Sequence, residues 1–263
     1  MELRRNLLRA SRERLKNPNY ASAPTPAPIQ EAYRRVTDQQ NNSISTPVNR
    51  IKTSTKSQYF GSNLSPDYIG KYSGETFIIA GCGASLNDYS DFSKYYVIGV
   101  NDIERILTPD FLVVVNDHRT FTRGRWDYVK ESLSPVIFTH LDNPGPITRS
   151  SHIAKIKIGR KGTPNLDQFN VVDHTLNSPY MAVIIAYQLG AKKIGMVGVD
   201  FSQNHFFSET GTHKLSKHLR SIDEEYGVLK NELSKKGVNV ANLSSSSLLT
   251  SWPKMDLESF DSL

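Results

Sequence analysis

Residues 77–86 read FIIAGCGASL, and this stretch decides the predicted fold. Its first four residues are apolar and suit a buried parallel strand, and the next five, GCGAS, have little side-chain bulk. A turn of small residues lets backbone N–H groups approach an anion, usually a phosphate. The stretch lacks the third glycine of the dinucleotide fingerprint and the Gly-Lys-Ser/Thr of a P-loop, so a tight turn without a ligand is the alternative.

Similar apolar runs recur from about residue 74 onward. Several are continuous, which is typical of strands covered on both faces; the runs are 77–80, 96–100, 111–115, 136–139, 153–158, 194–197 and 238–241. Helical patterns lie between them at 121–133, 178–189 and 216–236, and glycines follow the last two where helix ends are expected. Alternating strands and helices predict an α/β fold, a Rossmann-like, mainly parallel sheet with helices on both faces.

Residues 1–73 differ in composition from residues 74–263. The first 60 residues carry 11 Lys/Arg and 4 Asp/Glu, a net charge of +7, whereas the rest of the chain has a net charge of −1. The segment NPNYASAPTPAPIQ at 17–30 favours an extended backbone. We predict a basic, Pro/Ser-rich and largely irregular N-terminal arm at 1–73, either solvated or ordered on a protein partner, and a Rossmann-like nucleotide-binding domain at 74–263.

The cysteine content and the hydropathy of the sequence limit which cellular compartments fit this protein. Cys82 is the single cysteine, so the chain has no disulfide framework and a reducing compartment fits. No run approaches the ~20 apolar residues of a transmembrane helix. The charged start MELRRNLLRASRERLK has no apolar core behind it, which argues against a secretory signal. We expect a cytoplasmic protein without a transmembrane segment, and the sequence leaves a homo-oligomer open.

Open parallel sheets bind ligands outside the carboxyl ends of their strands, and polar residues follow five of the predicted strands. These residues are Gly81, Cys82, Gly83 and Ser85, then Asn101 and Asp102, then Asn116, Asp117, His118 and Arg119, then Asp200, Ser202, Gln203 and Asn204, and finally Ser244, Ser245 and Ser246. An amide such as that of Asn101 both donates and accepts hydrogen bonds, which suits a base, a ribose or a phosphate. Asp200 can bind a ribose hydroxyl or a metal. The structural alternatives are an Asx turn, a solvated Asp–Arg pair and a cap on the following turn.

Two histidines precede the last predicted helix. His213 and His218 lie in the segment HKLSKHLRS, near the expected ligand edge. The unperturbed pKa of histidine, ~6.5, suits a general base; the alternative for each residue is a solvated side chain. Histidines five apart do not share a helix face, and zinc-ligand spacing, a Gly-x-Ser-x-Gly elbow and an Asp-x-Asp motif are all missing from the sequence, so we predict no metal site.

Several of these segments resemble a known family. FIIAGCGASL is similar to the AG-x-GPSL loop of bacterial sialyltransferases of the α-2,3/α-2,8 type, and of the related 6-hydroxymethylpterin pyrophosphokinase-like domain of motility-associated glycosyltransferases. VIGVND at 97–102 resembles the asparagine segment after the family's second strand. SPYMAVIIAYQLGAKKIGMVGVDFSQN at 178–204 resembles its helix, strand and G-x-DF-x-QN pattern, and GVNVANLSSSSLLTSWP at 237–253 its last strand and serine loop. The similarity covers about residues 74–257.

The resemblance implies a Rossmann-like domain that binds a nucleotide or a nucleotide-sugar. In the sialyltransferases the donor is CMP-sialic acid, no metal is obligatory and a histidine is the base. Carried over by position, the nucleotide contacts are Gly81, Gly83, Ser85, Asn101, Ser178 and Ser244–Ser246, and the base is His218 or His213. The chain departs from the family at Cys82, where the family has asparagine, at Ala84, where it has proline, and at Ser202 and 207–208, where tyrosines assist the leaving phosphate.

Two classes of function fit these residues. The first is a glycosyltransferase that moves a sugar from a nucleotide-sugar, a CMP-sugar, to a hydroxyl acceptor. A Mg²⁺-dependent pyrophosphokinase-like enzyme is its variant, with Asp102, Asp117 or Asp200 as metal ligands. The second class is a non-catalytic nucleotide-pocket protein whose basic arm docks it in a larger assembly. The missing tyrosines and the long arm favour the second class, and the polar clusters at the strand ends favour an enzyme.

Overall fold

The computed structural model describes residues 50–53, 68–122, 124–142, 145, 147, 152–175, 177–201, 204–205, 208–209 and 215–263. All of them belong to one compact unit, Asn49–Leu263. Most of the predicted arm, residues 1–49 and 54–67, lies outside the described residues, as do His213, Ser202 and Gln203. Among the described residues, no helix combines the length and the apolar character needed to span a membrane.

A seven-stranded parallel sheet forms the centre of the domain, so the prediction of a Rossmann-like α/β fold is confirmed. The strands in spatial order are β11 (Asn239–Asn242), β8 (Lys193–Val197), β1 (Thr76–Ala80), β2 (Tyr96–Val100), β3 (Phe111–Val113), β4 (Val136–Thr139) and β5 (His152–Lys155). Every neighbouring pair is parallel. The chain therefore builds the sheet outward from β1 in one direction to β5, then returns and adds β8 and β11 on the other side of β1.

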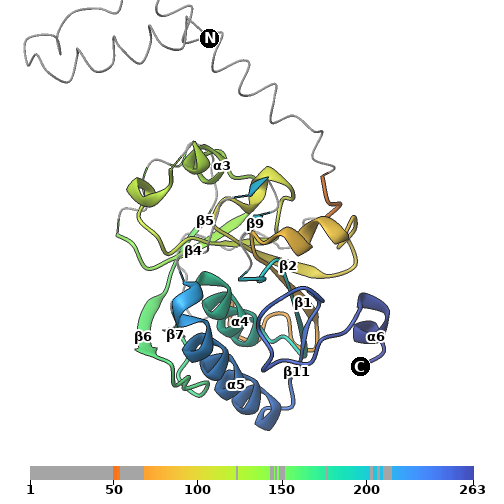
Figure 1. Ribbon diagram of the computed structural model, residues 1–263. Coiled ribbons are helices and arrows are strands. Elements are labelled where there is room, and N and C mark those ends of the chain that lie inside the picture. The colour runs from red at the N-terminus through yellow and green to blue at the C-terminus, as the bar shows by residue number, and fades with distance from the viewer. Residues whose placement is uncertain are drawn as a thin grey trace, which may run out of the picture. The chain divides into compact units, whose positions relative to one another are not determined.

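Helices cover both faces of this sheet (Figure 1). The helices are α3 (Arg125–Lys130), α4 (Ser178–Leu189), α5 (Leu219–Lys235) and α6 (Leu257–Asp261), and 3₁₀ turns lie at Ala84–Asp88, Ile103–Arg105, His118–Thr120 and Ser216–His218. Side chains of α4 and α5 share one hydrophobic core with alternate residues of β1, such as Phe77 and Ile79. The intervening residue Ile78 packs in a second core with α3 and α6. Continuous apolar runs are required in the central strands, such as β3 and β4, because all their residues are buried.

The structure corrects two elements of the sequence analysis. The predicted helix at 121–133 is shorter, because Gly124 takes the left-handed φ of +71° and α3 begins only after it. The predicted strand at 153–158 is divided at Ile156 into β5 and β6 (Lys157–Lys161), and β6 pairs with β7 (Val171–His174) outside the main sheet. A further two-stranded ribbon joins β9 (Asn204–His205) and β10 (Ser208–Glu209). The helix predicted at 178–189 is confirmed as α4.

Part of the predicted arm belongs to the domain core. Tyr68 and Tyr72 are buried, and Tyr72 packs edge-on against Phe77 and Phe111, with ring centroids 6.1 and 5.4 Å apart. Ile51 is buried in the second core, and its N–H donates to the carbonyl of Ile106 at 3.0 Å. Composition alone hid these contacts because single apolar residues sit among polar neighbours. The boundary predicted at residues 73 and 74 stays a prediction for the part of the arm that is not described.

Candidate functional site

The loop after β1 passes very close to the loop after β8. The N–H of Gly83 donates to the carbonyl of Gly198 at 2.7 Å. A Cβ on Gly81 would lie 2.3 Å from the Gly198 oxygen, and a Cβ on Gly198 would lie 2.3 Å from the Gly81 oxygen, so both positions require glycine. The strand order reverses between β1 and β8, which is where open α/β sheets usually bind ligands. In this protein the backbones of Gly81 and Gly198 are in close contact at that point.

Three of the predicted nucleotide contacts are linked by hydrogen bonds: Ser85 bonds to both Asp200 and Ser244. Ser85 Oγ lies 2.5 Å from Asp200 Oδ1 and 2.6 Å from Ser244 Oγ, and the Ser85 N–H donates to Asp200 Oδ2 at 2.8 Å. The N–H of Gly198 donates to both hydroxyls, at 3.1 and 3.2 Å. All three side chains are buried, and they tie together the loops after β1, β8 and β11. Their contact with a nucleotide stays a prediction, because serine and aspartate serve equally well to bind a ligand or a neighbouring loop.

Two N–H groups of the loop after β1 remain available to a ligand. The N–H groups of Gly81, Gly83 and Ser85 donate within the protein. Those of Cys82 and Ala84 have no acceptor among the described residues, and both residues are half-buried. Backbone N–H groups in a turn are the donors that cradle anionic oxygens in many phosphate sites. Two of the five residues of this loop therefore have backbone N–H groups without an acceptor among the described residues.

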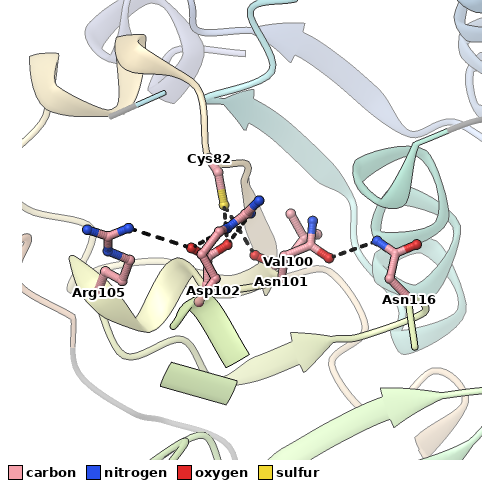
Figure 2. A network of polar contacts seen from close by, with 7 residues as sticks. Cys82, Val100, Asn101, Asp102, Arg105 and Asn116 are labelled. Carbon is pink, nitrogen blue, oxygen red and sulfur yellow. Dashed lines mark hydrogen bonds and ion pairs between the residues drawn. The ribbon is translucent and has the colours of Figure 1, made fainter. Parts of the chain in front are cut away.

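A second polar cluster joins the loop after β1 to the turn after β2. Arg125, the first residue of α3, donates to the fully buried carboxylate of Asp102 from Nε at 2.9 Å and also from Nη2. Arg105 Nη1 lies 4.0 Å from the same carboxylate. Figure 2 shows Cys82 pointing toward Asp102, with Sγ 3.8 Å from Asp102 Oδ1 and 3.6 Å from the Val100 carbonyl. Asp102, a predicted nucleotide contact, is thus paired with arginine inside the protein.

The setting of Cys82 keeps its thiol protonated. Burial of the thiol, and next the Asp102 carboxylate, raise the pKa of Cys82 well above its ordinary value, against the opposing charge of Arg125. The reactive form of cysteine is the thiolate. The geometry therefore does not support Cys82 as a nucleophile.

Two side-chain amides stand at the carboxyl ends of β2 and β3. Asn101 has a φ of +56°, a left-handed conformation that asparagine tolerates better than most residues, and its N–H donates to the Val113 carbonyl at 3.1 Å. Asn116 Nδ2 donates to Asn101 Oδ1 at 3.4 Å (Figure 2). The Nδ2 group of Asn101 and the Oδ1 atom of Asn116 have no partner among the described residues. The pair therefore offers a ligand one donor group and one acceptor.

Asp117 is occupied by a neighbouring arginine. Arg119 donates to its carboxylate from Nε at 2.9 Å, from Nη2 at 2.8 Å and from the backbone N–H at 2.8 Å. These bonds hold the pKa of the Asp117 carboxyl well below its ordinary value. His118 Nδ1 lies 3.4 Å from the same carboxylate, and the His118 ring lies 5.7 Å from that of Trp126. The Asp–Arg pair that the sequence left as the alternative is therefore present.

The remaining predicted residues are spread along the same edge. Ser178 is buried at the first position of α4, Ser245 and Ser246 are exposed after β11, and His218 is exposed at the end of the 3₁₀ turn before α5. No described contact joins any of them to Asn101 or Asn116, so the histidine base stays a prediction. Within the described ranges, no group of three or more His, Cys, Asp or Glu side chains could hold a metal ion.

Sequence analysis overlooked two histidines near this edge. His140 directly follows β4, and His174 is the last residue of β7; both are half-buried. The Nδ1 atom of His140 is buried without a partner among the described residues. Burial, and next the charge of Lys155, lower the pKa of His140, so its ring is neutral near pH 7. The rule that selected Asn101, a polar residue directly after an apolar run, also selects His140.

Comparison with known proteins gives similarity to solved structures alone. No family model and no curated protein matches the chain. A crystal structure of the sialyltransferase CST-II with a trisaccharide acceptor and CMP is 18% identical, with a TM-score of 0.43 over 69% of this chain and 86% of that chain. The structure of CstII from Campylobacter jejuni with the substrate analogue cytidine-5′-monophosphate is 18% identical, with a TM-score of 0.44 over 70% and 85% of the two chains. At this identity and TM-score the similarity establishes neither family nor function.

Proposed function

We propose that the protein is a glycosyltransferase that binds a CMP-sugar at the carboxyl ends of β1, β2 and β3 and transfers the sugar to a hydroxyl acceptor. One observation carries the proposal. The unpaired backbone amides of Cys82 and Ala84, and the unpaired side-chain groups of Asn101 and Asn116, belong to loops of three adjacent strands. The close contact of Gly81 with Gly198 leaves little room between β1 and β8, which supports a ligand position on the β2 side of β1. The choice of a cytidine nucleotide rests on the resemblance of the motifs at 77–86 and 178–204.

The unpaired groups match two parts of a nucleotide. Backbone N–H groups bind anionic oxygens, so the amides of Cys82 and Ala84 would take the phosphate. Side-chain amides donate and accept, so Asn101 and Asn116 would take the ribose or the base. As the bond to the sugar breaks, negative charge grows on the phosphate, and donors already in place stabilise it. The loop after β1 would therefore contribute to the rate as well as to binding.

The proposed reaction moves one proton to a base. The acceptor oxygen bonds to the anomeric carbon, the bond from that carbon to the phosphate oxygen breaks with its electron pair left on CMP, and the hydroxyl proton passes to a histidine. We propose His218 or His213 for this role. His140 is a third candidate because its ring is neutral and stands at the end of β4. The scheme needs no metal because the loop amides stabilise the leaving phosphate.

Melting temperature in the presence of nucleotides tests the pocket. A ligand that binds only the folded protein raises the apparent Tm. We expect CMP without Mg²⁺ to raise Tm more than UDP, GDP or ATP. Asn101→Gly should abolish this shift, because it removes the carboxamide while glycine accepts the left-handed backbone. Asn170→Gly is the matched control, because Asn170 also has a positive φ, +63°, but lies in the turn before β7; its CMP shift should persist.

Other nucleotide profiles would contradict the proposal. Stabilisation by ATP only, and only with Mg²⁺, would indicate the pyrophosphokinase-like reaction. No shift with any nucleotide would contradict an intact pocket. An equal loss of the CMP shift in Asn101→Gly and Asn170→Gly would place the binding site elsewhere.

A non-catalytic nucleotide-pocket protein is the second candidate. One observation favours it. The side chains of five predicted site residues form hydrogen bonds within the protein, namely those of Ser85, Asp102, Asp117, Asp200 and Ser244. Release of CMP from a CMP-sugar in the presence of hydroxyl acceptors separates the two candidates. Binding of CMP without enzyme-dependent release would favour the non-catalytic protein and its proposed role in an assembly, with a partner for the arm.

A further inference from the structure

The carboxylate of Asp102 is a junction of three chain segments. The Asp102 side chain has 0% exposure. It accepts from Arg125 at the start of α3 and lies 3.8 Å from the thiol of Cys82 in the loop after β1. Asp102 itself belongs to the turn after β2, directly after Asn101. One buried group therefore connects the two loops that carry the proposed phosphate and ribose contacts.

The bonds of this junction leave both loops little freedom. Arg125 engages both carboxylate oxygens, the pairing with the most restricted geometry available to arginine. A buried carboxylate that lost this partner would be an uncompensated charge, so the pair resists separation. The Cys82 thiol also lies 3.6 Å from the carbonyl of Val100, one residue before Asn101. The backbone on either side of Asn101 is thus held from α3 and from the loop after β1 (Figure 2).

A second Arg–Asp pair on the same edge provides the contrast. Arg119 also engages both carboxylate oxygens of Asp117. The Arg119 side chain is 79% exposed, however, and its partner is only two residues away, so this pair links no separate segments. Two pairs with the same hydrogen-bond pattern therefore differ in burial and in what they connect.

We propose that Asp102 and Arg125 are positioning residues of the ligand edge: their buried pair fixes the Cys82 loop relative to the Asn101 turn, so that the amides of both face one ligand. The part concerning the ligand rests on the proposed function. Asp102 has no exposed atoms with which to touch a nucleotide, so its effect on binding passes through Cys82 and Asn101. The pyrophosphokinase-like alternative, in which Asp102 holds Mg²⁺, would instead require this carboxylate to leave Arg125.

The reactivity of Cys82 tests the junction in the ligand-free protein. Cys82 is the single cysteine of the chain, so alkylation by iodoacetamide reports on this thiol alone. Asp102→Asn keeps the side-chain size but removes the charge that raises the thiol pKa, while Arg125 and Arg105 remain. A lower thiol pKa increases the thiolate fraction at neutral pH, and the alkylation rate rises with it severalfold, because the thiolate is the form that reacts. We expect this increase and a pH profile displaced to lower pH.

Two controls separate positioning from general loss of stability. Arg119→Gln breaks the exposed pair and should leave the alkylation profile of Cys82 unchanged. Asn177→Ala removes a helix cap that contacts Tyr180 and Tyr226, so it weakens the fold elsewhere and should also leave the profile unchanged. An unchanged profile in Asp102→Asn, or the same change in either control, would overturn the proposal. If Asp102→Asn does not fold, Arg125→Lys replaces it, because lysine keeps the charge but cannot pair with both oxygens.

Binding of CMP tests the link to the ligand. We expect the Kd for CMP to rise about tenfold in Asp102→Asn, a loss of about 1.4 kcal/mol of binding free energy. Wild-type affinity in this variant would overturn the positioning role. If the wild-type protein binds no nucleotide, the proposed function fails, but the alkylation experiment still decides whether the junction holds the two loops. The two failures are therefore distinguishable.

Discussion

Gly198 has no room for a side chain, and its substitution tests the close contact between the loops after β1 and β8. Its φ is +69°, and an added Cβ would lie 2.3 Å from the Gly81 oxygen. Gly198→Ala should lower the free energy of unfolding by about 2–6 kcal/mol, because a strained backbone costs about 1–3 kcal/mol and overpacking costs about the same. Urea denaturation followed by circular dichroism measures the loss.

Gly70→Ala is the matched control for this prediction. Gly70 has nearly the same φ, +68°, but no atom lies within 4 Å of its added Cβ. Gly70→Ala should therefore lose only the free energy of backbone strain, about 1–3 kcal/mol, and no contribution from overpacking. Equal losses in the two variants would show that the approach of the loops after β1 and β8 contributes nothing to stability.

The sequence predicts which residues lie at the carboxyl edge of the sheet better than it predicts their bonding partners within the protein. Gly81 and Gly83 were placed correctly in a tight turn because only glycine fits there. The hydrogen bonds of Asp102 and Asp200 could not be predicted from the sequence, because their partners Arg125 and Ser85 lie in distant segments. The left-handed φ of Asn101 was also unforeseen, although asparagine is enriched in that conformation.

The residue that caps α4, Asn177, also connects this helix to α5, and its substitution is a second test of what stabilises the fold. Asn177 Oδ1 accepts the N–H of Tyr180 at 3.1 Å and the hydroxyl of the buried Tyr226, on α5, at 2.9 Å. Asn177→Ala loses the cap, which costs about 0.5–2 kcal/mol, and leaves a buried hydroxyl unpaired, which costs about 1–3 kcal/mol. We expect a loss of about 2–4 kcal/mol in urea denaturation.

Asp256 caps α6 and is the matched control at this scale. Its carboxylate accepts the N–H of Ser259 at 2.8 Å, but α6 is a five-residue helix and the cap is exposed. Asp256→Ala should cost about 0.5–1 kcal/mol. If the two cap variants lose the same free energy, the connection from Asn177 to Tyr226 adds no stability.

Elements with clear signals at their ends are predicted correctly from the sequence, and those decided by contacts with other segments are not. The helix at 178–189 has a proline in its first turn and a glycine after its end, and it was predicted with its observed bounds. The run at 153–158 reads IAKIKI, and an alternation of isoleucine and lysine is compatible with one continuous strand, so nothing local shows that the chain leaves the main sheet at Ile156. After Ile156 the chain leaves the main sheet, and β6 pairs with β7, which lies later in the sequence.

At the scale of the whole molecule, ionisable groups divide the pH dependence of stability into two windows. His140 and His152 have pKa values below 6.5, in both cases first because of burial. Asp117 and Asp91 have pKa values below 3.8, held down by hydrogen bonds from Arg119 and Ser93. Protonation of the histidines therefore changes the stability between neutral and mildly acidic pH, and protonation of the carboxylates changes it only in strong acid.

Stability should fall as the pH falls from 7.5 to 5. The unfolded chain binds protons at His140 and His152 with the ordinary histidine pKa of about 6.5, whereas the folded protein binds them only at lower pH, so acid favours unfolding. The double variant His140→Gln/His152→Gln should flatten this slope and leave the loss below pH 4 intact, because that part belongs to carboxylates. Urea midpoints measured between pH 7.5 and 3 test this expectation. A wild-type midpoint that does not change down to pH 5 would show that His140 and His152 take up protons as readily in the folded protein as in the unfolded chain.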